Sequence, residues 1–260
     1  MRIARFAGDD DPRFGVIGDD NGVPTIAVLN GDPLYAGLNL SGQKIPLADV
    51  RLLAPVIPRS KVVCVGRNYV KHAAELGNDV PEEPLIFLKP NTSVIGPGEP
   101  IFYPEQSSNV HFEGELAVVI GRICRDVPVE DAKKVIFGYT VANDVTARDL
   151  QNKDGQWARA KGFDTFCPLG PWIETDFDPS DVQVTTRLGE ELKQDGRTSD
   201  MVFTVPDVIA YVSSFMTLLP GDVILTGTPD GVGPMQVGDT VSVTVEGIGT
   251  LTNQVVSRND

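Results

Sequence analysis

The stretch His111-Phe-Glu-Gly-Glu-Leu-Ala-Val-Val-Ile120 changes half-way from charged residues to five consecutive apolar ones. The apolar half predicts an interior β-strand. On a strand, residues i and i+2 point to the same face, so we expect Glu113 and Glu115 side by side. Paired carboxylates repel each other unless a cation or a proton lies between them. The segment alone leaves two interpretations open, a metal-binding pair and a solvated edge strand.

A third carboxylate follows the next apolar stretch. Asp144 comes directly after Tyr139-Thr-Val-Ala-Asn143, at the kind of strand end that often presents site residues. Three carboxylate ligands with open positions suit Mg²⁺ or Mn²⁺ better than Zn²⁺, which prefers nitrogen and sulfur donors. Further on, Arg148 and Asp149 are as consistent with an ordinary salt bridge as with a site role.

A possible base lies in Arg67-Asn-Tyr-Val-Lys-His-Ala-Ala-Glu75. His72 and Glu75 are three residues apart, so on a short helix they share a face. A carboxylate beside an imidazole fixes its tautomer and raises its basicity, as a water-activating base requires. An exposed helix pair is the alternative. Lys161 lies in an aromatic, Gly-flanked stretch, although a lone lysine is usually a surface residue.

The rest of the chain predicts an α+β protein dominated by strands. Its 260 residues include 26 Gly and 20 Pro, which suits many short strands separated by turns. We expect a small N-terminal β domain over 1–56 and a catalytic-sized domain over 57–260. Helices are predicted at 129–137 and after Thr204-Val-Pro-Asp207, which has the pattern of a capping box.

Composition and missing motifs exclude several function classes. The formal net charge of −14 disfavours binding to nucleic acid or to a membrane surface. No apolar run approaches the ~18 residues of a membrane span, and the start lacks a secretory signal pattern. Three widely spaced cysteines predict reduced thiols, so the cytoplasm is the expected location. There is no GxSxG elbow, phosphate-binding GK[ST] loop or HExxH pair.

Six blocks in this order resemble the fumarylacetoacetate hydrolase family, over roughly residues 60–256. They are Gly66-Arg-Asn-Tyr69, Phe87-Leu-Lys-Pro90, Glu113-x-Glu115, Asn143-Asp-Val-Thr-Ala-Arg-Asp149, Ala160-Lys-Gly-Phe-Asp-Thr165 and Leu225-Thr-Gly-Thr-Pro229. Six ordered blocks are far more specific than any one of them. The N-terminal module resembles the small leading domain of bacterial members.

The resemblance implies a mixed β-sandwich roll, a homodimer, and a Mg²⁺ or Mn²⁺ site that binds a small 2-oxo acid. It implies metal ligands at Glu113, Glu115 and Asp144. It implies catalytic residues at His72, Glu75 and Lys161. The positions that contact the substrate's oxo-acid end are matched by Gln151 and Thr228, and less closely by Arg67 and Tyr69.

A site of this kind implies enolate chemistry. A 2-oxo acid can chelate the cation through a carboxylate oxygen and the keto oxygen, and the cation stabilises the enolate that forms when a bond at C3 breaks. The same enolate serves hydrolysis of acylpyruvates, decarboxylation of oxaloacetate, and tautomerisation. Lys161 is expected to stabilise that charge or supply a proton, with a pKa lowered by desolvation.

Two alternatives accompany the prediction of a metal-dependent hydrolase or decarboxylase (lyase). One is a 2-hydroxyhepta-2,4-diene-1,7-dioate isomerase of aromatic catabolism. The other is a non-catalytic β protein that binds a metal or ligand. His72, Glu75 and Lys161 count against the second, because a binding module needs no base.

Overall fold

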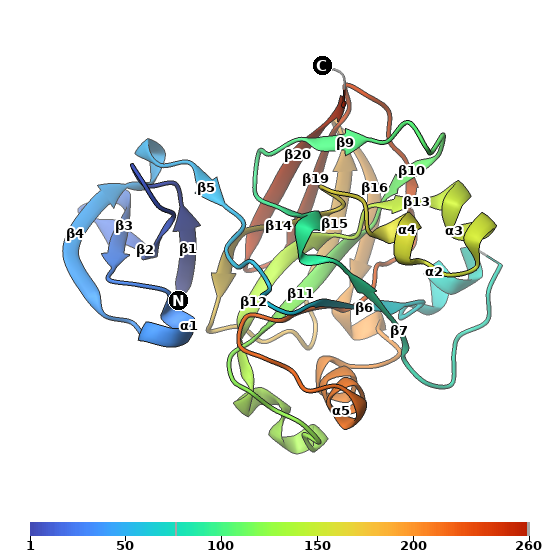
Figure 1. The fold of residues 1–260 in the computed structure, drawn as a ribbon, viewed down its shortest axis with the longest axis horizontal. Coiled ribbons are helices and arrows are strands. Elements are labelled where there is room, and N and C mark those ends of the chain that lie inside the picture. The colour runs from blue at the N-terminus through green and yellow to red at the C-terminus, as the bar shows by residue number, and fades with distance from the viewer. Residues whose placement is uncertain (76, 259–260) are drawn as a thin grey trace.

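The computed structural model describes residues 1–75 and 77–258 and confirms a strand-dominated α+β fold (Figure 1). The largest sheet in this described part has twelve strands. Ten of them follow the order β4 (Leu40–Pro46), β3 (Val23–Leu29), β2 (Arg13–Asp20), β1 (Arg2–Phe6), β14 (Cys167–Glu174), β12 (Ile136–Asn143), β11 (Gly114–Ile120), β17 (Val223–Leu225), β6 (Val62–Gly66) and β7 (Leu85–Lys89). In addition, β5 (Leu52–Leu53) pairs with β1, and β8 (Val94–Ile95) pairs with β14.

A second sheet packs against the middle of the first. Its order is β16 (Glu191–Arg197), β15 (Gln183–Leu188), β19 (Thr240–Val245), β20 (Gly249–Ser257) and β9 (Ile101–Tyr103). One apolar cluster contains Leu116 and Val118 of β11 together with Val243 and Val245 of β19. The cluster joins the two sheets into a sandwich, because alternate residues of each strand face inward.

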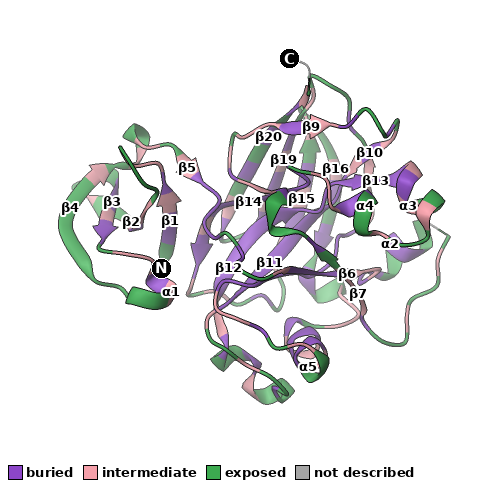
Figure 2. Ribbon diagram, in the orientation of Figure 1, coloured by how far each residue is buried: buried purple, intermediate pink, exposed green. Residues whose placement is uncertain are grey.

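Three short strands form a small sheet beside the sandwich. They are β13 (Thr146–Ala147), β10 (Val110–Phe112) and β18 (Gly233–Pro234). Strands β10 and β11 are interrupted only at Glu113, so the chain changes sheets at that residue. Strand β11 is buried throughout (Figure 2). The carboxylates at its start are therefore in the interior, not at a solvated edge.

The leading strands continue the large sheet. Figure 1 shows them in blue as a lobe at one end of the molecule, where β1 pairs antiparallel with β14 through Ile3 and Ile173. Their own small core is the cluster of Ala4, Phe6, Ile26 and Val28. Strand β4 at the edge is almost wholly exposed (Figure 2).

Helices are short. The α-helices are α1 (Pro33–Ala36), α2 (Val70–Glu75), α3 (Arg148–Asp154), α4 (Ala158–Lys161) and α5 (Val205–Phe215), and the 3₁₀ helices are η1 (Leu47–Asp49), η2 (Asn91–Ser93), η3 (Val129–Lys134) and η4 (Thr198–Asp200). In the described part of the chain, none is long and apolar enough to cross a bilayer.

Of the two predicted helices, one is confirmed and one needs correction. The capping box at α5 is present, since Thr204 accepts from the Asp207 backbone and Asp207 caps Thr204 in return. The helix predicted over 129–137 is only a 3₁₀ helix that ends at Lys134. Ile136 and Phe137 belong instead to β12, where the β-branched residue pairs with Ile120.

Candidate active site

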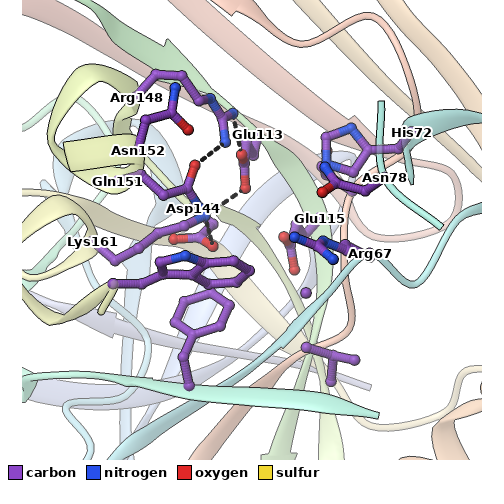
Figure 3. Close-up of a pocket in the computed structure, with 15 residues that line it drawn as sticks. Arg67, His72, Asn78, Glu113, Glu115, Asp144, Arg148, Gln151, Asn152 and Lys161 are labelled. Carbon is purple, nitrogen blue, oxygen red and sulfur yellow. Dashed lines mark hydrogen bonds and ion pairs between the residues drawn. The ribbon is translucent and has the colours of Figure 1, made fainter. Parts of the chain in front are cut away.

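A cavity of about 240 Å³ lies at the ends of β11 and β12 (Figure 3). It brings together residues that are far apart in the sequence, and most of the predicted site residues line it: Arg67, His72, Glu113, Glu115, Asp144, Gln151, Lys161 and Thr228. Its remaining walls come from Val65, Gly66, Asn78, Phe87, Arg148, Asn152 and Trp157.

Three carboxylates converge on the cavity. Glu113, Glu115 and Asp144 are at most 4% exposed, and one oxygen from each lies within 4.8 Å of the others. The register explains the meeting, because Gly114 pairs with Asn143 across β11 and β12 and thus places the residues beyond them together. The Glu113 carbonyl also accepts the Asp144 backbone N–H at 2.8 Å.

Lys161 joins two of these carboxylates. Its Nζ donates to Glu113 Oε2 at 2.7 Å and to Asp144 Oδ2 at 2.6 Å. It is 2% exposed, so the common surface location of a lone lysine does not apply. The prediction of a lowered pKa is wrong: burial alone would lower the pKa of Lys161, but Asp144 and Glu113 together raise it. Lys161 is therefore a buried ammonium group that holds its proton.

A second buried lysine, Lys89, was not among the predicted site residues. Lys89 Nζ donates to Asp144 Oδ1 at 2.6 Å and to the Val145 carbonyl at 3.1 Å, and the residue is 1% exposed. A signal was present in the sequence, since Lys89 lies in Phe87-Leu-Lys-Pro90, one of the six blocks that resemble the family. Asp144 thus has an ammonium group on each of its oxygens.

Arg148 is a site residue and not a partner of its neighbour Asp149. Its guanidinium hydrogen-bonds Glu113 Oε1 and donates at 2.6 Å to the side-chain oxygen of Gln151. Asp149 instead accepts from Ser107 and Ser108. Burial alone would raise the pKa of Glu113, but Lys161 and Arg148 hold it well below its usual range. Glu113 is therefore an anion.

Glu115 differs because no cationic side chain in the described residues pairs with it. Its Oε2 accepts the Gly227 backbone N–H at 2.7 Å. Burial, Asp144 and Glu113 raise the pKa of Glu115 well above its usual value. A divalent cation beside it would relieve that destabilised charge. An all-oxygen donor set of this kind fits Mg²⁺ or Mn²⁺, with Glu113, Glu115 and Asp144 as its holders.

His72 is buried beside the same cavity. Its Nδ1 lies 3.5 Å from Glu75 Oε2, longer than a hydrogen bond, and has no other partner among the described residues. Burial lowers the pKa of His72, so the ring is neutral near pH 7 and can accept a proton. Glu75 does not line the cavity. Its carboxylate accepts the Gly231 backbone N–H at 3.2 Å.

Arg67 and Tyr69 follow β6 in a turn that separates them. Arg67 has a positive φ of 57° and lines the cavity. Tyr69 is not among the lining residues. It is 3% exposed, and its backbone forms an isolated antiparallel β-bridge with that of Met201. The structure therefore does not place Tyr69 against a ligand in this cavity.

Thr228 lines the cavity, and its hydroxyl is already hydrogen-bonded within the protein. Its Oγ1 donates to the Gly114 carbonyl at 2.9 Å and accepts from Gln194 at 2.7 Å. The aromatic part of the wall is the edge-to-face pair Phe87 and Trp157, whose ring centroids are 5.2 Å apart.

The chain matches two protein-family models. A model of the family described as fumarylacetoacetate (FAA) hydrolase C-terminal matches residues 61–256. The chain belongs to the fumarylacetoacetate hydrolase family. A second model, described as Rv2993c-like, N-terminal, matches residues 1–55.

Several named proteins are similar to this chain along most of its length. A solved structure of 5-carboxymethyl-2-hydroxymuconate delta-isomerase from Mycobacterium smegmatis has 54% identity and a TM-score of 0.92, covering 99% of this chain and 100% of that one. Human mitochondrial oxaloacetate tautomerase FAHD2A is 46% identical over 82% of this chain and 71% of its own. Maleylpyruvate hydrolase from Sphingobium sp. SYK-6, solved with manganese(II) and pyruvate, has 35% identity and a TM-score of 0.81, covering 99% of each chain.

Proposed function

We propose that this chain is a Mg²⁺- or Mn²⁺-dependent enzyme that forms the enolate of a 2-oxo or 2,4-dioxo carboxylic acid, and that it hydrolyses acylpyruvates or decarboxylates oxaloacetate. One observation carries the proposal: three buried carboxylates converge on the cavity that a neutral histidine and a buried ammonium group also line. Burying this much charge is costly for folding, so it points to chemistry and not to stability.

The cation would supply Lewis-acid stabilisation of the negative charge that develops on the substrate's oxo oxygen. Lys161 holds a proton beside that charge, because Asp144 and Glu113 keep it ionised. It can pass the proton to C3 when the C3–C4 bond breaks. His72, neutral and nearly buried, accepts the proton of a water that adds to the C4 carbonyl. Gln151, held by Arg148, offers its amide N–H to the substrate carboxylate.

The direct experiment mixes metal-stripped protein with acetylpyruvate or oxaloacetate, with and without Mg²⁺ or Mn²⁺, and follows products by proton NMR. We expect metal-dependent pyruvate plus acetate from the first substrate, or pyruvate plus CO₂ from the second. Metal-dependent stabilisation without turnover of any oxo acid would contradict the proposal and favour a non-catalytic binding protein.

A proton-shift reaction is the second candidate, either isomerisation of a 2-hydroxy-dienedioate or tautomerisation of oxaloacetate. Its support is that Lys161 and His72 lie on opposite sides of the cavity (Figure 3), where they could exchange protons with two carbons of one ligand. The names of the isomerase and the tautomerase among the relatives also favour it. Solvent deuterium that enters the product without C–C cleavage would identify this reaction.

A further inference from the structure

We infer that Gln194, a residue of the second sheet, is a positioning residue that holds Glu115 in place for the cation. It acts through the loop of residues 227–231, which connects β17 to β18. The inference rests on the proposed function, since it concerns how a ligand of the proposed cation is held. Gln194 does not line the cavity, and it lies outside the six blocks of sequence that resemble the family.

The loop touches both halves of the site. At its start, the Gly227 N–H donates to Glu115 Oε2 at 2.7 Å. At its end, the Gly231 N–H donates to the carboxylate of Glu75, the residue beside His72, at 3.2 Å. The first contact bears on the cation, because the other oxygen of Glu115 can face the cavity only while Oε2 is held. A shift of the loop would therefore turn this carboxylate away from its place.

The Gln194 side chain clamps the middle of the loop. It is fully buried, and its Nε2 donates to Thr228 Oγ1 at 2.7 Å and to the Pro229 carbonyl at 2.8 Å. Its Oε1 accepts the Gly114 N–H at 2.9 Å, at the start of β11. One amide on β16 thus ties the loop to the strand that carries Glu115.

The directions of these hydrogen bonds leave the clamp a single arrangement. The Gly114 N–H can only donate and the Pro229 carbonyl can only accept, so the two ends of the Gln194 amide cannot exchange places. Because Nε2 donates to Thr228 Oγ1, that hydroxyl sends its own proton to the Gly114 carbonyl, at 2.9 Å. An apolar side chain in place of Gln194 would leave buried donors and acceptors without partners, which is costly.

Two glycines keep the second sheet close enough for the clamp. A Cβ at Gly196, two residues further along β16, would lie 2.5 Å from Pro229 Cβ. A Cβ at Gly114 would lie 2.1 Å from Thr186 Oγ1 on β15. Strand β16 and the loop are therefore in direct contact, and the position of the loop depends on the strand.

Gln194→Met tests the clamp, because methionine has a similar length and lacks both ends of the amide. Isothermal titration of the metal-stripped full chain with Mg²⁺ measures the dissociation constant. We expect it to be at least ~10-fold larger than in wild type, the usual effect of removing a group that orients a metal ligand. Gly196→Ala displaces the loop by a different route, since its added methyl group meets Pro229. It should weaken Mg²⁺ binding too, and it decides the question if Gln194→Met does not fold.

Asn253→Leu is the matched control. Asn253 lies on β20 of the same sheet, is 2% exposed, and donates through Nδ2 to the Gly96 and Glu99 carbonyls at 2.9 and 2.8 Å. Each substitution removes a buried amide that donates twice, so both variants should melt below wild type. Only Gln194→Met should weaken Mg²⁺ binding, because in the described part of the chain the Asn253 side chain makes no hydrogen bond to the loop.

The outcomes distinguish this inference from the function on which it rests. A wild-type chain that binds no Mg²⁺ and turns over neither acetylpyruvate nor oxaloacetate overturns the proposed function. Mg²⁺ binding that is present in wild type and unchanged in folded Gln194→Met, or in Gly196→Ala where the first variant does not fold, overturns only the role of Gln194. An equal loss of Mg²⁺ affinity in Asn253→Leu also overturns that role, because any loss of stability would then weaken the site.

Discussion

At its N-terminal end the large sheet buries apolar residues such as Phe6 and Ile26, whereas at the ends of β11 and β12 it buries Glu113, Glu115 and Asp144. The first region follows the ordinary rule that burial of apolar surface stabilises a fold. The second breaks it, because buried charges cost desolvation energy that close partners only offset. The contrast indicates where function lies. The residues of the N-terminal strands stabilise the fold, whereas the residues at the ends of β11 and β12 are suited to chemistry.

The largest effect is expected for Glu115→Gln, which keeps the shape of the side chain and removes its charge. It tests whether the carboxylates at the ends of β11 and β12 serve chemistry. We expect loss of Mg²⁺ binding and a fall in turnover of more than ~10³-fold, as for removal of a group that acts in the transition state. The metal-free protein should be no less stable, because burial, Asp144 and Glu113 already disfavour a charge on this side chain. Calorimetry and turnover of the exposed control Glu130→Gln should match wild type; unchanged turnover in Glu115→Gln would sink the site assignment.

The next largest expected effect is the loss of hydrolysis in His72→Ala. Without a base for water, hydrolysis of acetylpyruvate should fall by ~10²- to 10⁴-fold, the usual contribution of general base catalysis. Decarboxylation of oxaloacetate needs no water and should survive in part. The ratio of the two rates, measured on one preparation, is the readout. An equal loss of both reactions would refute a water-specific role.

Ile26→Ala tests the opposite region. Truncating this fully buried side chain should lower the free energy of unfolding by ~2–5 kcal/mol. Folded protein should keep kcat/KM within ~2-fold, because the residue packs in the N-terminal cluster and not in the cavity. Denaturant titration and kinetics at low temperature measure the two quantities. A large fall in kcat/KM at full folding would mean that the N-terminal strands shape the site.

Lys89→Met removes one of the two ammonium groups on Asp144. Because Lys161 remains, we expect the metal-free protein to lose roughly 2 kcal/mol, less than for a buried charge left without any partner. Mg²⁺ should then raise the melting midpoint more in Lys89→Met than in wild type, because the cation replaces the positive charge of the lost ammonium group beside Asp144. A smaller metal-induced shift in the variant would show that Lys89 mainly orients Asp144.

The pH dependence of hydrolysis is the smallest expected effect. Burial lowers the pKa of His72 below its ordinary 6.5, and the neutral ring is the active base. The midpoint of the decline in rate should therefore lie below pH 6.5, and the rate should fall tenfold per unit at still lower pH. Metal occupancy must be held saturating across the series. A midpoint at or above pH 6.5 would contradict a lowered pKa of His72.

Local patterns in the sequence predict much of this molecule. The apolar run Leu116–Ile120 and the capping box at Thr204 each describe the segment that contains them, and both are confirmed. The convergence of Glu113, Glu115 and Asp144 was expected from strand periodicity and the family blocks, and the structure brings them together. The strand and the capping box depend on neighbours in sequence, whereas the approach of Asp144 to the two glutamates was implied by the ordered family blocks.

What could not be predicted depends on contacts between distant segments. The pKa of Lys161 rises because two carboxylates from other strands reach its Nζ, and no local pattern reports them. Lys89 meets Asp144 only because β7 lies at the sheet edge nearest the cavity. The strained turn at Arg67 exists because Asn68 is held by residues more than a hundred positions away.

Deuterium exchange at C3 tests the central claim most directly. The enolate of a 2-oxo acid forms by loss of a C3 proton or by cleavage of a bond at C3, and it takes up a solvent proton at C3 when it returns to the oxo acid. Metal-stripped protein is incubated in D₂O with oxaloacetate or pyruvate, with and without Mg²⁺, and the C3 proton signals are followed by NMR beside the Glu115→Gln variant. We predict exchange well above the rate of Mg²⁺ alone, which requires both the cation and Glu115. Exchange no faster than with Mg²⁺ alone, or exchange that persists in Glu115→Gln, would contradict the account.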